Sequence, residues 1–159
     1  VVTLDVEDYP GAVGDRLGRW ALASVYGKGG AASGPIYKSC RAEGDKTIIT
    51  FDHADGGLMV AEIPAVGKAP TEVKAGRLRC FSVAGEDRVF HSAEAHIRGD
   101  TVEVSSKRVP RPVAVRYACR IDPRGMNLYN KARLPASPFR TDDWPIESIE
   151  ALTERLKGL

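Results

Sequence analysis

The stretch LRCFSVAGEDRVFHSAEAHIRGDTVEVS, residues 78–105, contains three short strand-like runs separated by two turn sequences. Apolar and β-branched residues predict strands at 78–84 and 89–97, and the regular apolar–polar alternation of 101–105 predicts a third. The sequences Gly-Glu-Asp and Arg-Gly-Asp between these runs are typical of turns. Short strands at such close spacing indicate an antiparallel sandwich or jelly roll, so we expect a mainly β fold.

The same pattern continues on both sides of this stretch. Upstream, residues 36–53 read IYKSCRAEGDKTIITFDH, in which a turn at 43–46 joins two strand-like halves and predicts a hairpin. Residues 64–76 contain proline and glycine and predict a loop. Downstream, residues 113–119 (VAVRYAC) form the last strong strand pattern. The β pattern therefore covers most of the chain from residue 34 onward.

The run RYACRIDPRGMNLYNKARLPASPFRTD, residues 116–142, is irregular but rich in large apolar groups. It has three prolines and two asparagines at turn-like positions, together with Leu128, Tyr129, Leu134 and Phe139. A flexible tail would not keep so many large apolar side chains. We therefore expect an ordered segment that lies across a surface and is pinned by its aromatic residues.

The two ends of the chain carry a different pattern. Residues 1–6 (VVTLDV) predict a buried strand, and residues 13–26 predict a helix that ends at the following glycine. A final helix is expected at about 146–156. A strand followed by a helix is part of an α/β unit. We therefore divide the chain into an incomplete α/β part at 1–30 and a β-rich domain at 31–159.

The composition and charge of the chain limit the classes of binding partner that the sequence predicts. The chain has 43% apolar and 28% charged residues, and its formal net charge is +2. A charge so near neutral, without a long basic run, gives no support for a nucleic-acid or membrane partner. The sequence also lacks the glycine fingerprint of a nucleotide site, so no cofactor is predicted.

The three cysteines, Cys40, Cys80 and Cys119, lack the close spacing of a zinc site, so no metal is predicted. As single residues in apolar surroundings they are expected to be small core residues. In a secreted protein, one disulfide with one free thiol is the alternative.

Several longer motifs resemble those of a known family. They are Phe81-Ser-Val-Ala-Gly-Glu-Asp87, Pro112-Val-Ala-Val-Arg-Tyr117, Asn127-Leu-Tyr-Asn-Lys131 and Leu134-Pro-Ala-Ser-Pro-Phe-Arg-Thr-Asp142. Upstream, Val13-Gly-Asp-Arg-Leu17 and Ser33-Gly-Pro-Ile-Tyr-Lys38 extend the likeness over nearly the whole chain. These motifs are similar to the C-terminal region of the sialate O-acetylesterases, the sialic-acid-specific 9-O-acetylesterase family.

The resemblance implies a fold and an activity for the complete protein. Members of that family resemble serine esterases with an SGNH-type α/β hydrolase domain, and they remove acetyl groups from sugar hydroxyls. Residues 1–30 would then be the last strand and helix of that domain, and residues 31–159 an accessory β domain. The substrate would be an O-acetylated sugar, and the N-terminal hydrolase part would be a further partner. The location would be secreted, periplasmic or, in a eukaryote, lysosomal.

The resemblance places no catalytic residue in this chain. The family's nucleophilic serine lies in a Gly-Asp-Ser block, and this tripeptide does not occur in the 159 residues. The catalytic histidine comes from a His-Pro segment before the helix, where this chain has Tyr9-Pro10. Either Tyr9 replaces the histidine, or the histidine is absent between Asp8 and Tyr9. A phenol with a pKa near about 10 cannot act as a base at neutral pH, so we predict that the chain alone is inactive.

Four residues are candidates for substrate binding. Arg116 and Arg140 could hold the carboxylate of sialic acid by bidentate pairing, or they could tie the irregular segment to the sheet. Tyr129 and Trp144 could stack on a sugar ring, or they could be packing residues. The alternative function is a carbohydrate-binding or structural β-sandwich module without catalysis.

The three histidines do not form a recognisable site. His53 follows Asp52 at the end of the predicted hairpin, where the two could line a sugar-contacting or catalytic edge, or His53 could be a surface residue. His91 and His96 are five residues apart in one expected strand, so they should face opposite sides and could not hold one metal ion.

Overall fold

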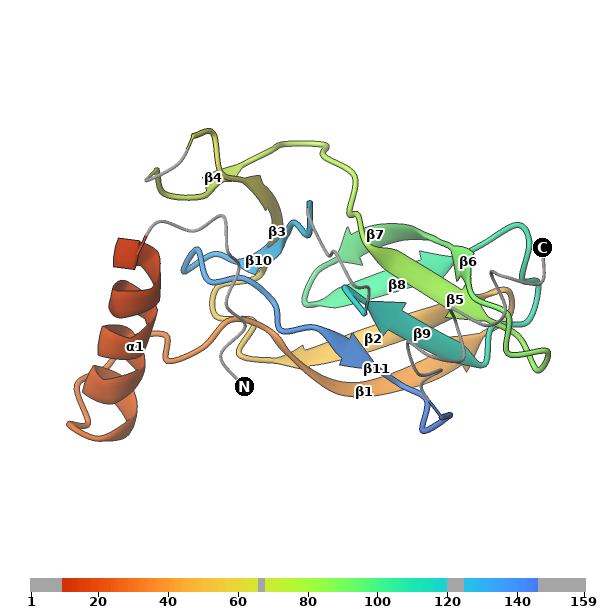
Figure 1. The fold of residues 1–159 in the computed structure, drawn as a ribbon, viewed down its shortest axis with the longest axis horizontal. Coiled ribbons are helices and arrows are strands. Elements are labelled where there is room, and N and C mark those ends of the chain that lie inside the picture. Colours follow the sequence, from red (N-terminus) through yellow and green to blue (C-terminus); the bar gives the residue numbers. More distant parts are fainter. Residues whose placement is uncertain (1–9, 66–67, 120–124, 146–159) are drawn as a thin grey trace, which may run out of the picture.

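The structure is a computed structural model that describes residues 10–65, 68–119 and 125–145, without the side chains of residues 10–13 (Figure 1). Within these residues it contains one helix and short strands. They are α1 (Pro10–Ser24), β1 (Ile36–Glu43), β2 (Lys46–Asp52), β3 (Leu58–Glu62), β4 (Thr71–Glu72), β5 (Phe81–Ala84), β6 (His91–Ser92), β7 (Glu94–Arg98), β8 (Thr101–Ser105), β9 (Ala114–Tyr117), β10 (Leu128–Asn130) and β11 (Phe139–Arg140). The expected strand at 1–6, the expected helix at 146–156 and Tyr9 lie outside the described residues.

The strands form three antiparallel sheets. One four-stranded sheet has the order β1-β2-β8-β7, the other has the order β11-β9-β5-β6, and a three-stranded sheet has the order β10-β3-β4. Figure 1 shows the two four-stranded sheets lying over one another, with the three-stranded sheet at the end of the molecule that carries α1. The fold is therefore mainly β and antiparallel, as the sequence predicts.

The core lies between the two four-stranded sheets. Val102 and Val104 of β8 are fully buried, whereas the residues on either side of them are only half-buried. On the facing sheet, Val83 and Val115 are also fully buried. All four belong to one continuous apolar cluster. The alternation that predicted the strands thus directs every second side chain of β8 into the sandwich.

The expectation of one strand at 89–97 is wrong. This run consists of β6 and β7, which belong to different four-stranded sheets. Ala93 lies between them, and its amide donates a hydrogen bond to the Phe81 carbonyl at 3.1 Å. The chain crosses from one sheet to the other at Ala93, so His91 and His96 lie on different sheets. Periodicity alone does not reveal this crossing, because both strands keep an extended backbone.

The predicted hairpin at 36–53 is confirmed. β1 and β2 pair along their length, and Gly44 in the turn has a φ of 64°, which glycine adopts without strain. The pairing register shifts between Tyr37 and Ser39, so β1 contains a β-bulge. The expected loop at 64–76 contains β4, which pairs with the end of β3.

The closing segment, which we define as residues 125–145, is ordered and anchored at two strands. β10 pairs with β3, and β11 pairs with β9. The fully buried Tyr117 accepts a hydrogen bond from the Leu128 amide through its phenol oxygen, at 3.1 Å. The ring of Phe139 stacks on Tyr37 with their centroids 5.1 Å apart. The expected segment pinned by aromatic residues is confirmed.

Helix α1 begins at Pro10, earlier than expected, because the fixed φ and missing N–H of proline suit the first helical position. After the helix, Gly27 has a φ of 61°, and the Lys28 amide donates to the Leu22 carbonyl at 2.9 Å. This is the glycine stop that the sequence predicts. Several large apolar side chains at this end of the chain are exposed to solvent: Leu17, Trp20, Leu22, Val25 and Tyr26.

Candidate functional site

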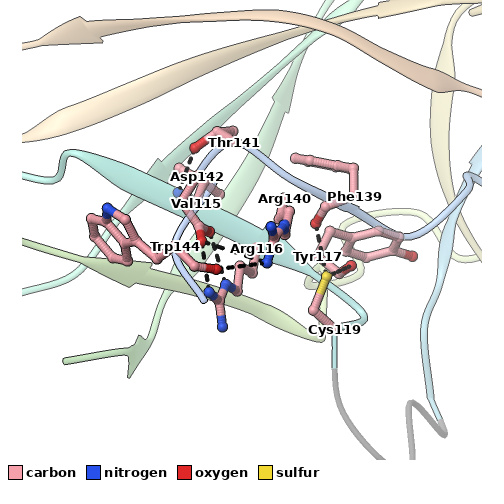
Figure 2. Close-up of polar contacts among 9 residues, drawn as sticks. All are labelled: Val115, Arg116, Tyr117, Cys119, Phe139, Arg140, Thr141, Asp142 and Trp144. Carbon is pink, nitrogen blue, oxygen red and sulfur yellow. Dashed lines mark hydrogen bonds and ion pairs between the residues drawn. The ribbon is translucent and has the colours of Figure 1, made fainter. Parts of the chain in front are cut away.

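Arg116 and Arg140 lie side by side on paired strands. Arg116 is on β9 and Arg140 is on β11, and the two residues are direct partners in the register. Asp142 follows β11, and its carboxylate accepts two hydrogen bonds from Arg116, from Nε at 2.8 Å and from Nη2 at 2.6 Å (Figure 2). Nη1 of Arg140 lies 4.0 Å from the same carboxylate. A bidentate pair of this kind fixes the planes of both groups.

The Asp142 carboxylate is shielded from solvent. Its side chain is 1% exposed, and that of Arg116 is 20% exposed. The hydrogen bonds from Arg116 hold the pKa of Asp142 below its usual range, and the same bonds raise the pKa of Arg116. Both groups are therefore charged at neutral pH. Since either charge alone would be poorly solvated here, the pair fastens the end of the closing segment to β9.

Aromatic rings extend this ion pair toward the surface. The guanidinium carbon of Arg116 lies 4.0 Å from the ring centroid of Phe90. The Phe90 ring meets the Trp144 ring edge-on, with centroids 5.7 Å apart, and the Arg88 guanidinium carbon lies 5.3 Å from the Trp144 centroid. Arg140 Nη1 donates to the Trp144 carbonyl at 3.1 Å. The result is a stack of two aromatic rings with a cation at each end.

Three of the four candidate binding residues therefore meet at one place: Arg116, Arg140 and Trp144. Nε and Nη2 of Arg116 both donate to Asp142, so this guanidinium ties the closing segment to the sheet. Trp144 is half-buried between the Phe90 ring and the Arg88 guanidinium. Part of the indole thus remains accessible at the surface.

The fourth candidate, Tyr129, lies apart from this cluster, on β10. It is 6% exposed and packs in a small apolar cluster with Met59 and Ala61. Most of its surface is therefore in contact with the protein itself. The structure does not bring Tyr129 together with the other three candidates.

A groove of about 530 Å³ lies beside α1. One wall carries Leu17 and Trp20 of the helix, and the other carries Ile36, His53 and the 134–137 part of the closing segment. The lining is mainly apolar, and the Trp20 side chain is 53% exposed. A hollow of this size and composition is typical of small-molecule sites and of surfaces that another domain covers.

Close packing beneath α1 holds the floor of this groove in place. A Cβ atom on Gly34 would overlap the carbonyl oxygen of Pro135, so only glycine allows these two backbones to approach. The fully buried Asn130 donates from Nδ2 to the carbonyls of Ser33 and His53, each at 3.0 Å. Its Oδ1 accepts from the amide of Leu134 at 3.0 Å. One amide side chain thus joins three distant parts of the chain.

His53 lies on the rim of the groove, exposed, with a φ of 59°. The Asp52 carboxylate pairs with Nζ of Lys38 at 2.7 Å. Asp52 is therefore engaged with β1, and the two residues do not form a catalytic dyad in this structure. His53 is a surface histidine at the edge of an apolar groove.

Asn127 and Asn130 have a structural part that turn-like positions in the sequence do not reveal. Asn127 accepts from the Arg79 amide and donates to the Arg77 carbonyl, both at 2.9 Å. Like Asn130, Asn127 is buried, so both side chains hydrogen-bond within the core rather than at an exposed turn. The signal that could have found them is their position on either side of the apolar pair Leu128 and Tyr129.

Other kinds of site can be tested over residues 10–65, 68–119 and 125–145. In these ranges, no three or more His, Cys, Asp or Glu side chains lie close enough together to hold a metal ion. No helix in the same ranges is long and apolar enough to cross a membrane. The expectation that the three cysteines are small core residues is wrong: Cys40 and Cys119 are exposed, Cys80 is half-buried, and all three are free thiols.

Comparison with known proteins gives one informative likeness. No family model matches the sequence, and no curated protein matches it. Among solved structures, the crystal structure of XAC1771, a carbohydrate acetylesterase from Xanthomonas citri, is similar with a TM-score of 0.72 and 38% sequence identity. The match covers 84% of this chain and 28% of that chain. The chain thus spans less than a third of that esterase's length, and the predicted likeness to carbohydrate esterases is confirmed at that broad level.

Proposed function

We propose that this chain is the C-terminal part of a sialate O-acetylesterase-like enzyme that hydrolyses O-acetyl esters on sialic acid or related sugars. The observation that carries the proposal is the 38% identity, at a TM-score of 0.72, to part of a carbohydrate acetylesterase. The motif resemblance adds the preference for sialic acid. By the same resemblance, the complete protein is secreted or periplasmic.

The exposed apolar side of α1 supports the proposal that the catalytic part of the same protein packs against this helix. Trp20 and Leu22 of α1, and Val25 just after it, are each about half exposed or more, although helices of stable domains normally bury such side chains. The groove beside them has a mainly apolar lining. Because the matched esterase is more than three times longer than the matched region, an N-terminal hydrolase part is the occupant that we propose.

The chemistry of the chain supports a non-catalytic role for these residues on their own. The sequence contains no Gly-Asp-Ser block, and the family's histidine is either replaced by Tyr9 or absent between Asp8 and Tyr9. Neither a serine nucleophile nor its base is therefore supplied, and ester hydrolysis needs both. The accessory part would hold the sugar and stabilise the catalytic part.

Acetate release tests this proposal directly. The isolated chain and the longer protein that contains it are each incubated with 9-O-acetylated sialic acid and with an acetylated neutral sugar. We expect acetate from the longer protein alone, with a higher kcat/KM for the sialic acid ester. Turnover by the isolated chain above a buffer blank, or no turnover by the longer protein on either ester, would contradict the proposal.

A second candidate function is a carbohydrate-binding module, and the exposed Trp20 at the groove favours it. Indole rings at the edge of a hollow are suited to stacking on sugar faces. Titration of the chain with sialosides should then quench tryptophan fluorescence, and Trp20→Ala should remove the change whereas Trp144→Ala should keep it. Binding together with activity of the longer protein supports a binding role within an esterase, and binding with no activity favours the module.

A further inference from the structure

A second, smaller pocket shares Arg16, Leu134 and Pro135 with the apolar groove. Its volume is about 180 Å³. Its walls come from α1, from residues 68–70 and from the turn at 130–135. Four basic side chains and a single acidic one line it: Arg16, Arg19, Lys68, Arg133 and Asp15. Positive charge is therefore in excess in this pocket.

Some basic side chains elsewhere on the molecule have acidic partners. Lys131, two residues before Arg133, pairs with Glu72, and Arg79 pairs with Glu62 at 2.9 Å. Across the described part of the chain, by contrast, neither Lys68 nor Arg133 makes an ion pair. Clustered like charges repel one another unless an anion neutralises them, so this arrangement favours an anionic ligand.

The backbone at Arg133 is held in an uncommon conformation. Its φ is 64°, which costs a residue with a side chain of order 1 kcal/mol. The turn closes through a hydrogen bond from the Arg133 amide to the Asn130 carbonyl at 2.9 Å, and the buried Asn130 side chain fixes its base. Arg133 is therefore presented from a rigid turn, which lowers the entropy lost when it binds a ligand.

The remaining walls suit a ring rather than a bare ion. Ile63, Pro70 and Pro135 contribute apolar surface, and Tyr129 also lines the pocket. An apolar wall beside a cluster of cations matches a sugar that has one apolar face and one acidic substituent. A hydrated inorganic ion would gain nothing from the apolar wall.

We propose that this pocket binds the anionic substituent, carboxylate or sulfate, of an acidic sugar. The inference rests on the proposed carbohydrate esterase function and adds that the accessory part selects acidic substrates. Arg133 and Lys68 are specificity-determining residues, because they would contact the acidic group and not the ester.

The test is binding to the isolated chain, followed by NMR chemical shifts. N-acetylneuraminic acid, glucose 6-sulfate and glucose are titrated separately. We expect the two acidic sugars to shift resonances of residues 68–70 and 129–135, with an affinity that falls as salt is raised. Glucose should leave these resonances unchanged. Equal binding of all three sugars, or shifts from the acidic sugars only outside these residues, would overturn the proposal.

Arg133→Gly and Lys68→Ala sharpen this test. Glycine accepts a φ of 64°, so the first variant removes the cation and keeps the turn. Each variant should lower the affinity for the acidic sugars roughly tenfold, since a hydrogen bond to a charged group contributes that much. Arg41→Ala is the matched control, because Arg41 is an exposed cation on β1 that pairs with Glu43. Unchanged affinity in both pocket variants would sink the inference.

The inference and the proposed function can fail separately. If the longer protein releases acetate but Arg133→Gly leaves its preference for acidic over neutral esters unchanged, the pocket inference fails and the esterase proposal stands. If the isolated chain binds acidic sugars but the longer protein hydrolyses no ester, the esterase proposal fails and the pocket stands.

Discussion

The two ends of this molecule differ in how they are stabilised. At the sandwich, apolar side chains are buried within the chain itself, and the closing segment is tied down by the Arg116–Asp142 pair. At α1, apolar side chains such as Trp20 and Leu22 face solvent. The sandwich is therefore self-sufficient, whereas α1 has the surface of an element that packs against something further.

Asn130 lies where the two ends meet, and its removal should have the largest effect. Asn130→Ala leaves two carbonyls and one amide in the core without their partner, which should lower the free energy of unfolding by about 4 kcal/mol. Urea denaturation measures this loss. Asn127→Ala, which removes two hydrogen bonds, should cost less; a larger loss for Asn127→Ala would show that the junction is not the critical point.

Gly34 lies in the connection between α1 and the sandwich, where the addition of a single methyl group should lower the stability of the protein. In Gly34→Ala the new Cβ meets the Pro135 carbonyl oxygen, so backbone must move, at a cost of about 3 kcal/mol. Gly18→Ala is the matched control on α1, where a Cβ meets nothing, and it should stabilise the helix by about 0.5 kcal/mol. Thermal unfolding distinguishes the two, and equal melting temperatures would contradict the close approach.

Breaking the Arg116–Asp142 ion pair should have the next largest effect on stability. Asp142→Ala leaves Arg116 without its carboxylate in a partly buried position, which should lower stability by about 2 kcal/mol. Asp143, the next residue, is exposed, so Asp143→Ala should change stability by less than about 0.5 kcal/mol. A similar loss in the two variants would mean that the pair does not fasten the closing segment.

The Arg116–Asp142 pair should also make the stability of the protein depend on pH in the acidic range. Because the pKa of Asp142 is lowered in the folded state, its contribution is complete above the unfolded-state pKa of about 4 and is lost as the pH falls through the lower folded-state value. The difference in stability between the wild type and Asp142→Asn should therefore be constant near neutral pH and shrink below about pH 4. Urea titrations at several pH values measure this, and a difference that stays constant into acid would contradict the assignment.

The smallest effect is expected just after α1, at Val25, and its size should depend on whether the rest of the longer protein is present. Val25→Ser changes an exposed residue, so the isolated chain should shift by less than about 0.5 kcal/mol. In the longer protein, the same variant should cost about 1.5 kcal/mol if Val25 is covered. Val113→Ser, which changes another exposed valine, is the control and should leave the stability of both the isolated chain and the longer protein unchanged. Equal behaviour of the two variants in the longer protein would remove the distinction between the two ends.

Local patterns predicted most of the β elements. The hairpin at 36–53 and the strand at 101–105 could be predicted because alternation and turn residues are encoded within a few positions. The crossing at Ala93 could not, since β6 and β7 share one backbone conformation. Arg116 could be predicted as a candidate, but its pairing with Asp142 across 26 positions depends on how the closing segment folds back. The groove and the basic pocket could not be predicted either, because each is formed by residues far apart in sequence.

The crossing at Ala93 also determines where this domain can change in length. β6 and β7 form one continuous run that belongs to both four-stranded sheets. A one-residue insertion there would turn every side chain of β7 to the opposite face of its sheet. An insertion beside Gly44 or Gly99 would only enlarge an exposed turn. Among descendants of a common ancestor, hairpin tips should therefore drift in length, while the number of residues between β6 and β7 is held constant by the geometry of the sandwich.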